Sequence, residues 1–146
     1  MCYFLGICSS HYIDGDTTIS IGEREIVLAN ITSSQKQKRP GMFYYNIMEG
    51  GCACAFFRKR NAVIHGLVED SGKIEDFSRE VRKILNLFPG NAQTEIILYW
   101  AGDVDEYSLL IDFEDIIQVF THKQISKQDF IQKYPFIEER VAYTLI

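Results

Sequence analysis

The sequence predicts one α+β domain over residues 1–146, with a mostly antiparallel sheet and helices packed on one face. Three observations predict this class. Short runs rich in aromatic and β-branched residues fill the first half of the chain. One amphipathic helix pattern follows them, and the last third mixes short helix and strand patterns. Strands that cluster ahead of helices are typical of an antiparallel sheet covered by helices.

The predicted strands come first in the chain. We expect them at residues 2–8, 17–21, 25–31, 42–48, 52–57 and 62–68. Gly22 and Glu23 separate the second and third runs, which predicts a tight hairpin. Residues 32–41 are polar and basic, which predicts an exposed loop. In the first run, the alternation of a strand places Cys2 and Cys8 on the same face.

The clearest helix pattern covers residues 74–88. Its apolar stripe at helical spacing consists of Ile74, Phe77, Val81, Ile84, Leu85 and Phe88. Ser71 is a candidate N-cap, and Glu75 and Asp76 fall in the first turn, where the helix dipole favours negative charge. Pro89 ends the pattern. We therefore expect this stripe to pack on the sheet.

Four further elements are expected in the last third of the chain. Residues 94–100 form a strongly apolar strand pattern. Asp112 can cap a short helix whose apolar face consists of Phe113, Ile116, Ile117 and Phe120. Ser126, with an acidic residue three positions later, predicts the start of another helix at about residues 127–133. Residues 140–146 alternate as a last strand.

Composition limits the classes of function. The chain has a net charge of −5, which disfavours nucleic acid as a partner because a phosphate backbone requires a basic surface. Its 47% of hydrophobic residues are enough for a packed core. The apolar run at residues 2–8 is too short for a signal peptide or a membrane span. We therefore expect a cytoplasmic protein of bacterial style that does not bind membranes.

The cysteines carry the most distinctive chemistry of the sequence. Cys52 and Cys54 lie one residue apart behind Gly50 and Gly51. In a flat strand their side chains would point the same way about 6–7 Å apart, whereas zinc needs its sulfurs about 3.8 Å apart. The two glycines can supply the bend that brings the thiols together. With Cys2 as the third ligand, these residues form the predicted metal site, and zinc is the expected ion.

Other interpretations of the same cysteines stay open. A fourth ligand would come from Cys8, His11, His65 or His122. The Cys-x-Cys pair could instead act as a redox thiol pair, which requires a lowered pKa and a partly exposed site. The cysteines could also be small buried residues of the core, since reduced cysteine behaves as a small hydrophobe.

Two motifs together resemble those of a known group of sequences. The chain opens with Met-Cys-Tyr-Phe-Leu, and a strand with Tyr44 and Tyr45 precedes Gly-Cys-Ala-Cys at residues 51–54. This combination resembles small uncharacterised bacterial proteins that begin Met-Cys-x-Tyr-Leu and later carry Gly-x-Cys-x-Cys. This chain has Ala55 where that group has glycine. The resemblance implies that Cys2, Cys52 and Cys54 belong to one local arrangement.

No complete catalytic or cofactor motif is present in the sequence. We therefore expect a non-catalytic binding or interaction protein, such as an immunity-type or accessory factor, with a protein partner. One alternative is a metal-binding or thiol-redox protein that uses the Cys-x-Cys pair. A second alternative is a small-molecule enzyme, whose polar-lined pocket sequence patterns do not reveal.

Overall fold

A computed structural model describes residues 3–21, 23–36, 39–49, 65–66, 79–100, 112–133 and 138–146. Its strands are β1 (Tyr3–Ser9), β2 (Thr17–Ile21), β3 (Arg24–Asn30), β4 (Phe43–Met48), β5 (Thr94–Trp100), β6 (Thr121–Ile125) and β7 (Val141–Leu145). The helices are the short 3-10 helix η1 (Thr32–Ser34), α3 (Phe113–Val119), α4 (Lys127–Lys133) and a helical segment at 79–85. These elements make the protein an α+β fold.

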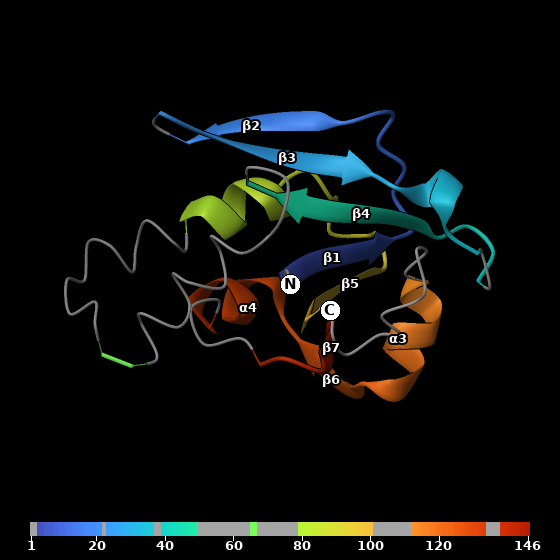
Figure 1. Cartoon of the computed structure of the whole chain (residues 1–146). Coiled ribbons are helices and arrows are strands. Elements are labelled where there is room, and N and C mark those ends of the chain that lie inside the picture. The colour runs from blue at the N-terminus through green and yellow to red at the C-terminus, as the bar shows by residue number, and fades with distance from the viewer. Residues whose placement is uncertain are drawn as a thin grey trace.

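The seven strands form one sheet in the order β2-β3-β4-β1-β5-β7-β6 (Figure 1). All neighbouring strands are antiparallel except β6 and β7, which are parallel. This confirms the prediction of a mostly antiparallel sheet. The register of β2 and β3 pairs Ile21 with Arg24, so the predicted two-residue hairpin is also confirmed.

Both faces of the central strands are apolar, and each face carries its own core. Leu5 and Ile7 of β1 belong to the first cluster, together with Ile96 and Leu98 of β5. The alternate residue Cys8 belongs to the second cluster. The second cluster also contains Met42, Tyr44, Ile97, Tyr99, Phe113, Ile116, Ile117, Phe120 and Ala142. Two apolar faces each require a cover.

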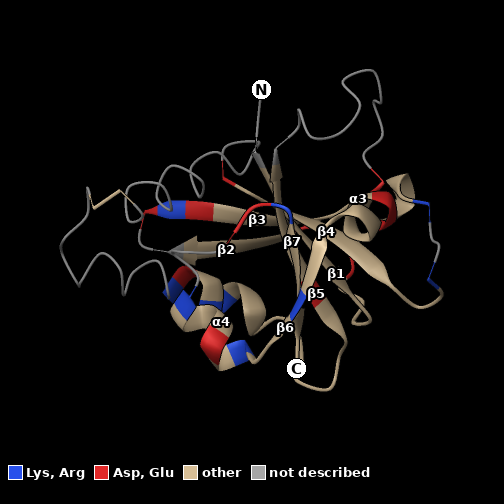
Figure 2. Cartoon of the chain, turned by 90° about the horizontal axis from the view of Figure 1, so that it is seen from below, with Lys and Arg blue, Asp and Glu red and all other residues tan. Residues whose placement is uncertain are grey.

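The helices accordingly lie on both faces of the sheet, and the expectation that they pack on one face needs correction. The segment at 79–85 and α4 contribute to the first cluster through Val81, Ile84, Leu85, Phe130 and Ile131. Helix α3 contributes to the second cluster instead. Figures 1 and 2 show α3 across the sheet from α4. The one-sided arrangement was inferred from element order, which does not specify the face that a later helix covers.

Local signals placed the short helices well. The Asp112 side chain accepts a hydrogen bond from the backbone N–H of Glu114 at 3.2 Å, as expected of the N-cap of α3. The Ser126 hydroxyl accepts one from the N–H of Asp129 at 3.0 Å, at the start of α4. Among the described residues, no helix is long and apolar enough to cross a membrane.

Strand β6 was not expected from the sequence. Four of its five residues are exposed, so it lacks the alternation of apolar and polar positions that marks a half-buried strand. Backbone pairing to β7 alone defines it. The strand expected at 52–57 and most of the first half of the helix at 74–88 lie outside the described residues. Most of the strand expected at 62–68 lies outside them too, but its described residues 65–66 form a turn, with a φ of 68° at Gly66, so the strand prediction is wrong at these two positions.

Gly6 in β1 allows α3 to approach the sheet closely. A Cβ atom at this position would lie 2.6 Å from Cζ and 2.7 Å from Cε2 of Phe113. The Phe113 ring is fully buried, with its centroid 6.1 Å from that of Tyr44 and 5.8 Å from that of Tyr99. The ring therefore has no free space into which it could retreat.

We predict that Gly6→Ala destabilises the protein by about 1–3 kcal/mol, because the added methyl group overlaps the buried Phe113 ring. Chemical denaturation followed by circular dichroism measures the change. Gly90→Ala is the matched control, since a Cβ there meets nothing within 4 Å. Its effect should stay within about 0.5 kcal/mol. Equal effects of the two substitutions would contradict the close approach of α3 to β1.

Candidate functional site

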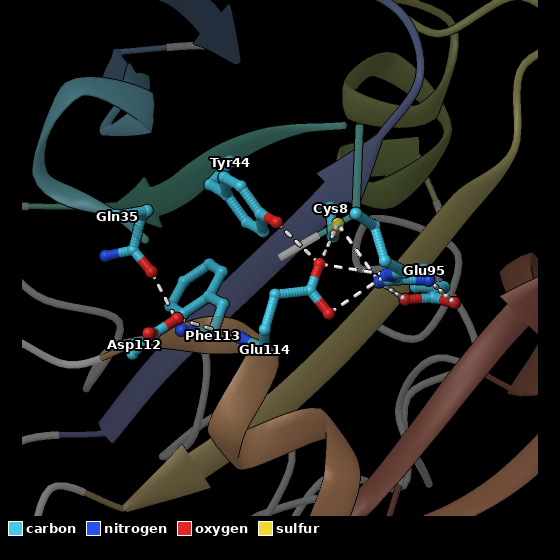
Figure 3. Close-up of polar contacts among 8 residues, drawn as sticks. Cys8, Gln35, Tyr44, Glu95, Asp112, Phe113 and Glu114 are labelled. Carbon is cyan, nitrogen blue, oxygen red and sulfur yellow. Dashed lines mark hydrogen bonds and ion pairs between the residues drawn. The ribbon is translucent and has the colours of Figure 1, made fainter. Parts of the chain in front are cut away.

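A cluster of polar side chains lies between α3 and the sheet (Figure 3). It consists of Cys8, Arg39, Tyr44, Glu95 and Glu114. They come from β1, the segment before β4, β4 itself, β5 and the first turn of α3. The cluster thus joins parts of the chain that are distant in sequence.

Sheet register brings three of these residues together. Cys8 lies opposite Tyr44 in the pairing of β1 with β4, and opposite Glu95 in the pairing of β1 with β5. Residues that are directly opposite in a sheet point to the same face. Glu114 approaches the same face of the sheet from α3. The Asp112 cap fixes where α3 begins and therefore places Glu114 in its first turn.

The Arg39 guanidinium bridges two carboxylates. Its Nε donates to both carboxylate oxygens of Glu114 at 2.9 Å. Its Nη1 and Nη2 donate to the two oxygens of Glu95 at 2.9 and 2.6 Å. Nη2 also lies 3.4 Å from Sγ of Cys8. Such fork-shaped, charge-assisted bonding fixes geometry as well as supplying energy.

The cluster is largely shielded from water. Glu95 and Glu114 are 5% and 4% exposed, whereas the Arg39 side chain keeps 34% of its surface exposed. The Tyr44 hydroxyl donates to Oε1 of Glu114 at 2.5 Å. Burial, together with this bond, raises the pKa of Tyr44. The hydrogen bonds to Glu95 raise the pKa of Arg39, which therefore stays charged.

The chemistry of Cys8 is suppressed at this site. Burial raises the pKa of its thiol well above the ordinary value, and Arg39 only partly opposes that effect. The thiol therefore stays protonated at neutral pH, and its Sγ lies 3.9 Å from Oε1 of Glu114 as a weak donor. A buried, protonated thiol is not a nucleophile. We call the cluster of Cys8, Arg39, Tyr44, Glu95 and Glu114 the clasp, because its charged bonds hold the segment before β4, the sheet and α3 together.

The predicted metal residues Cys2, Cys52 and Cys54 lie outside the described residues, so their arrangement stays a prediction. Of the further candidate ligands, Cys8 belongs to the clasp and His122 is exposed on β6. His11 packs edge-on to Phe88, and His65 is exposed. Within the described ranges, no group of three or more His, Cys, Asp or Glu side chains could hold a metal ion.

Sequence reasoning missed the clasp. Arg39 was assigned to an exposed loop, and neither glutamate belonged to a motif. One signal was present: Glu95 interrupts an otherwise apolar strand pattern, and Glu114 lies on a helix with a wide apolar face. A carboxylate at such a position requires a cationic partner nearby. The sequence does not say which of the 15 Lys and Arg residues supplies it.

A second feature is a concentration of basic residues on the opposite side of the sheet (Figure 2). We call it the basic face. It comprises the segment at 79–85 and α4, which together carry Arg79, Arg82, Lys83, Lys127 and Lys133. These are five of the 15 basic residues in the chain, against two of its 20 acidic residues, Glu80 and Asp129. Glu80 is buried and bonds to Arg24, so Asp129 is the acidic side chain that these two elements keep at the surface.

A groove of about 360 Å³ runs across the basic face. It is lined by Arg82, Lys127, Gln128, Ile131 and Gln132. Arg82, Gln128 and Gln132 are exposed, and the buried Ile131 provides an apolar contact. Lys127 is half-buried and donates to Oδ1 of Asn86 at 3.3 Å. The groove therefore presents two cations and two amides around an apolar surface.

Comparison with known proteins adds no relative. No family model, no curated protein and no solved structure matches the chain. The resemblance to the Met-Cys-x-Tyr-Leu group therefore stays a prediction, and the functional argument depends on the clasp and the basic face.

We predict that Arg39→Met destabilises the protein by about 2–4 kcal/mol, because it leaves two buried carboxylates without a cation. Urea denaturation measures the loss. Lys123→Met is the control, since the ion pair of Lys123 with Glu138 is exposed and screened by solvent, so its loss should change the stability far less. A near-neutral Arg39→Met would contradict the clasp.

We predict that Cys8 reacts with iodoacetamide only after unfolding, because burial keeps its thiol protonated. Mass spectrometry of the peptide that contains Cys8 measures the rate with and without urea. The folded thiol holds its proton where an unfolded thiol ionises, near pH 9, so the free energy of unfolding should fall as pH rises past that value. Alkylation of native Cys8 at the rate of a free thiol would contradict this.

Proposed function

We propose that the protein is a non-catalytic binding protein of the immunity or accessory type, and that the groove on its basic face receives an acidic segment of a protein partner. The supporting observation is charge segregation. The basic face has an excess of positive charge, although the whole chain carries −5. A local field opposite in sign to the net charge favours one orientation of an anionic partner.

The chemistry of the groove favours a peptide over a simple ion. Arg82 and Lys127 can each pair with a carboxylate, and Ile131 offers contact to an apolar side chain between them. The side-chain amides of Gln128 and Gln132 can bond to the backbone of an extended segment. An acidic segment with an apolar residue between its carboxylates uses all of these groups.

The clasp favours a binding role over catalysis. Catalytic groups need a pKa near the working pH and access to the substrate. In the clasp the Cys8 thiol is buried and protonated, and the carboxylates are held by Arg39. The hydrogen bonds and ion pairs among the clasp residues are those expected of a structural site. The metal or thiol function of Cys2, Cys52 and Cys54 remains the alternative, to be tested by elemental analysis.

We predict that a blocked peptide of alternating Glu and Leu binds the groove, and that the same peptide with Gln in place of Glu does not. Titration of the labelled protein by NMR should shift the amide signals of residues 79–85 and α4. Binding should weaken as salt rises, because exposed charges are screened. Arg82→Glu should weaken it roughly tenfold, because the substitution replaces an attractive charge with one that repels the carboxylate of the peptide.

Lys36→Glu is the matched control for that experiment. Lys36 is also exposed, but it lies in the segment after η1 and outside the groove. Lys36→Glu changes the net charge by the same amount as Arg82→Glu. The comparison therefore separates the loss of a direct contact in the groove from the effect of net charge on long-range attraction. Equal losses for Arg82→Glu and Lys36→Glu, or signal shifts confined to other elements, would contradict the proposed site.

A further inference from the structure

The two edges of the sheet differ in how they are protected. β6 carries His122 and Lys123, and Lys123 pairs with Glu138 at 2.6 Å. Lysine on an edge strand discourages pairing with another chain. β2, at the other edge, has the sequence Thr-Thr-Ile-Ser-Ile and no charged residue. Its own side chains therefore lack the usual device against edge-to-edge pairing, and the lysine at this edge, Lys83, comes from the segment at 79–85.

Strand β2 is held in an extended shape by the rest of the fold. All five of its residues pair with β3. Asp16, just before it, accepts a hydrogen bond from the N–H of Asn30 at 3.0 Å. Lys83 donates to the Ser20 carbonyl at 3.3 Å. Among the described residues, Figure 1 shows no element beyond β2 on its outer side. The edge is thus ordered in advance, which lowers the entropic cost of adding a strand.

We infer that β2 pairs with β2 of a second copy of this chain, in antiparallel register centred on Ile19. In this register Ile19 lies opposite itself, and Thr18 lies opposite Ser20 of the second copy. Every cross-strand pair is then β-branched or hydroxyl-bearing, and none joins like charges. The outward-facing backbone groups of Thr18 and Ser20 bond to those of the second copy, and the Ser20 carbonyl exchanges its bond from Lys83 for one from the second copy.

The sequence of β2 argues for a second copy as the occupant. When a strand pairs with a copy of itself in antiparallel register, its central residue lies opposite itself and the residues on either side lie opposite one another. Each of these pairs must be favourable or at least neutral. β6 fails this requirement, because its central residue Lys123 would face itself. β2 meets it, and its central Ile19 packs against the first core cluster, so pairing continues an apolar face across the interface. Because the same edge of both copies is used up in a two-fold contact, the assembly stops at a dimer.

The salt dependence of this dimer should be opposite to that of the acidic ligand. Each copy carries −5, so the two copies repel at long range, and added salt should strengthen their association. The inference does not depend on the proposed function. The experiment on peptide binding to the groove and the experiment on β2 pairing can give a negative result independently of one another.

Sedimentation velocity over a concentration series tests the inference on the full chain. We expect a monomer–dimer equilibrium for the wild type. Thr18→Lys together with Ser20→Lys should weaken dimerisation at least tenfold, because two lysines would face two lysines of the second copy. Gln124→Lys on β6 is the control and should leave the equilibrium unchanged. Circular dichroism confirms that each variant is folded.

Ile19→Cys tests the register directly. In the proposed pairing the two introduced cysteines are opposite one another, within reach of a disulfide. Mild oxidation should therefore give a covalent dimer that is absent from the wild type and from Gln124→Cys. A chain that stays monomeric at all concentrations, a dimer that the β2 lysines do not affect, or larger open-ended species would each overturn the inference.

Discussion

The bridge from Arg39 to Glu95 and Glu114 determines how the α3 side of the sheet is assembled. Both carboxylates are buried, and one guanidinium bonds to each of them through two of their oxygens. A buried charge without such a partner is strongly destabilising. Helix α3, strand β5 and the segment before β4 are therefore bound to a common position. The close contact of Phe113 with Gly6 depends on the same placement.

This arrangement separates the structure into a closed side and an open side. Around the clasp, Tyr44 and Cys8 have raised pKa values and stay protonated, so these two groups hold the fold together and are not reactive. On the other side, the segment at 79–85 and α4 cover the first core and leave basic side chains at the surface. Binding is proposed there because the exposed charge is there.

Sequence reasoning succeeded where the cause is local. The apolar run of β5 and the caps at Asp112 and Ser126 depend on neighbouring residues, and the structure confirms them. The clasp could not be found this way, because Arg39 lies 56 residues from Glu95 and 75 from Glu114. The same limit led to the error about helices on one face. β6 was missed because an exposed strand has no hydrophobic period.

Native-state hydrogen exchange of Arg39→Met, compared with the wild type, tests the role of the clasp most directly. If Arg39 holds α3 to the sheet, the amides of α3 should lose protection by far more than those of α4, because α4 packs on the opposite face. Unchanged protection in α3, or an equal loss in both helices, would contradict this role.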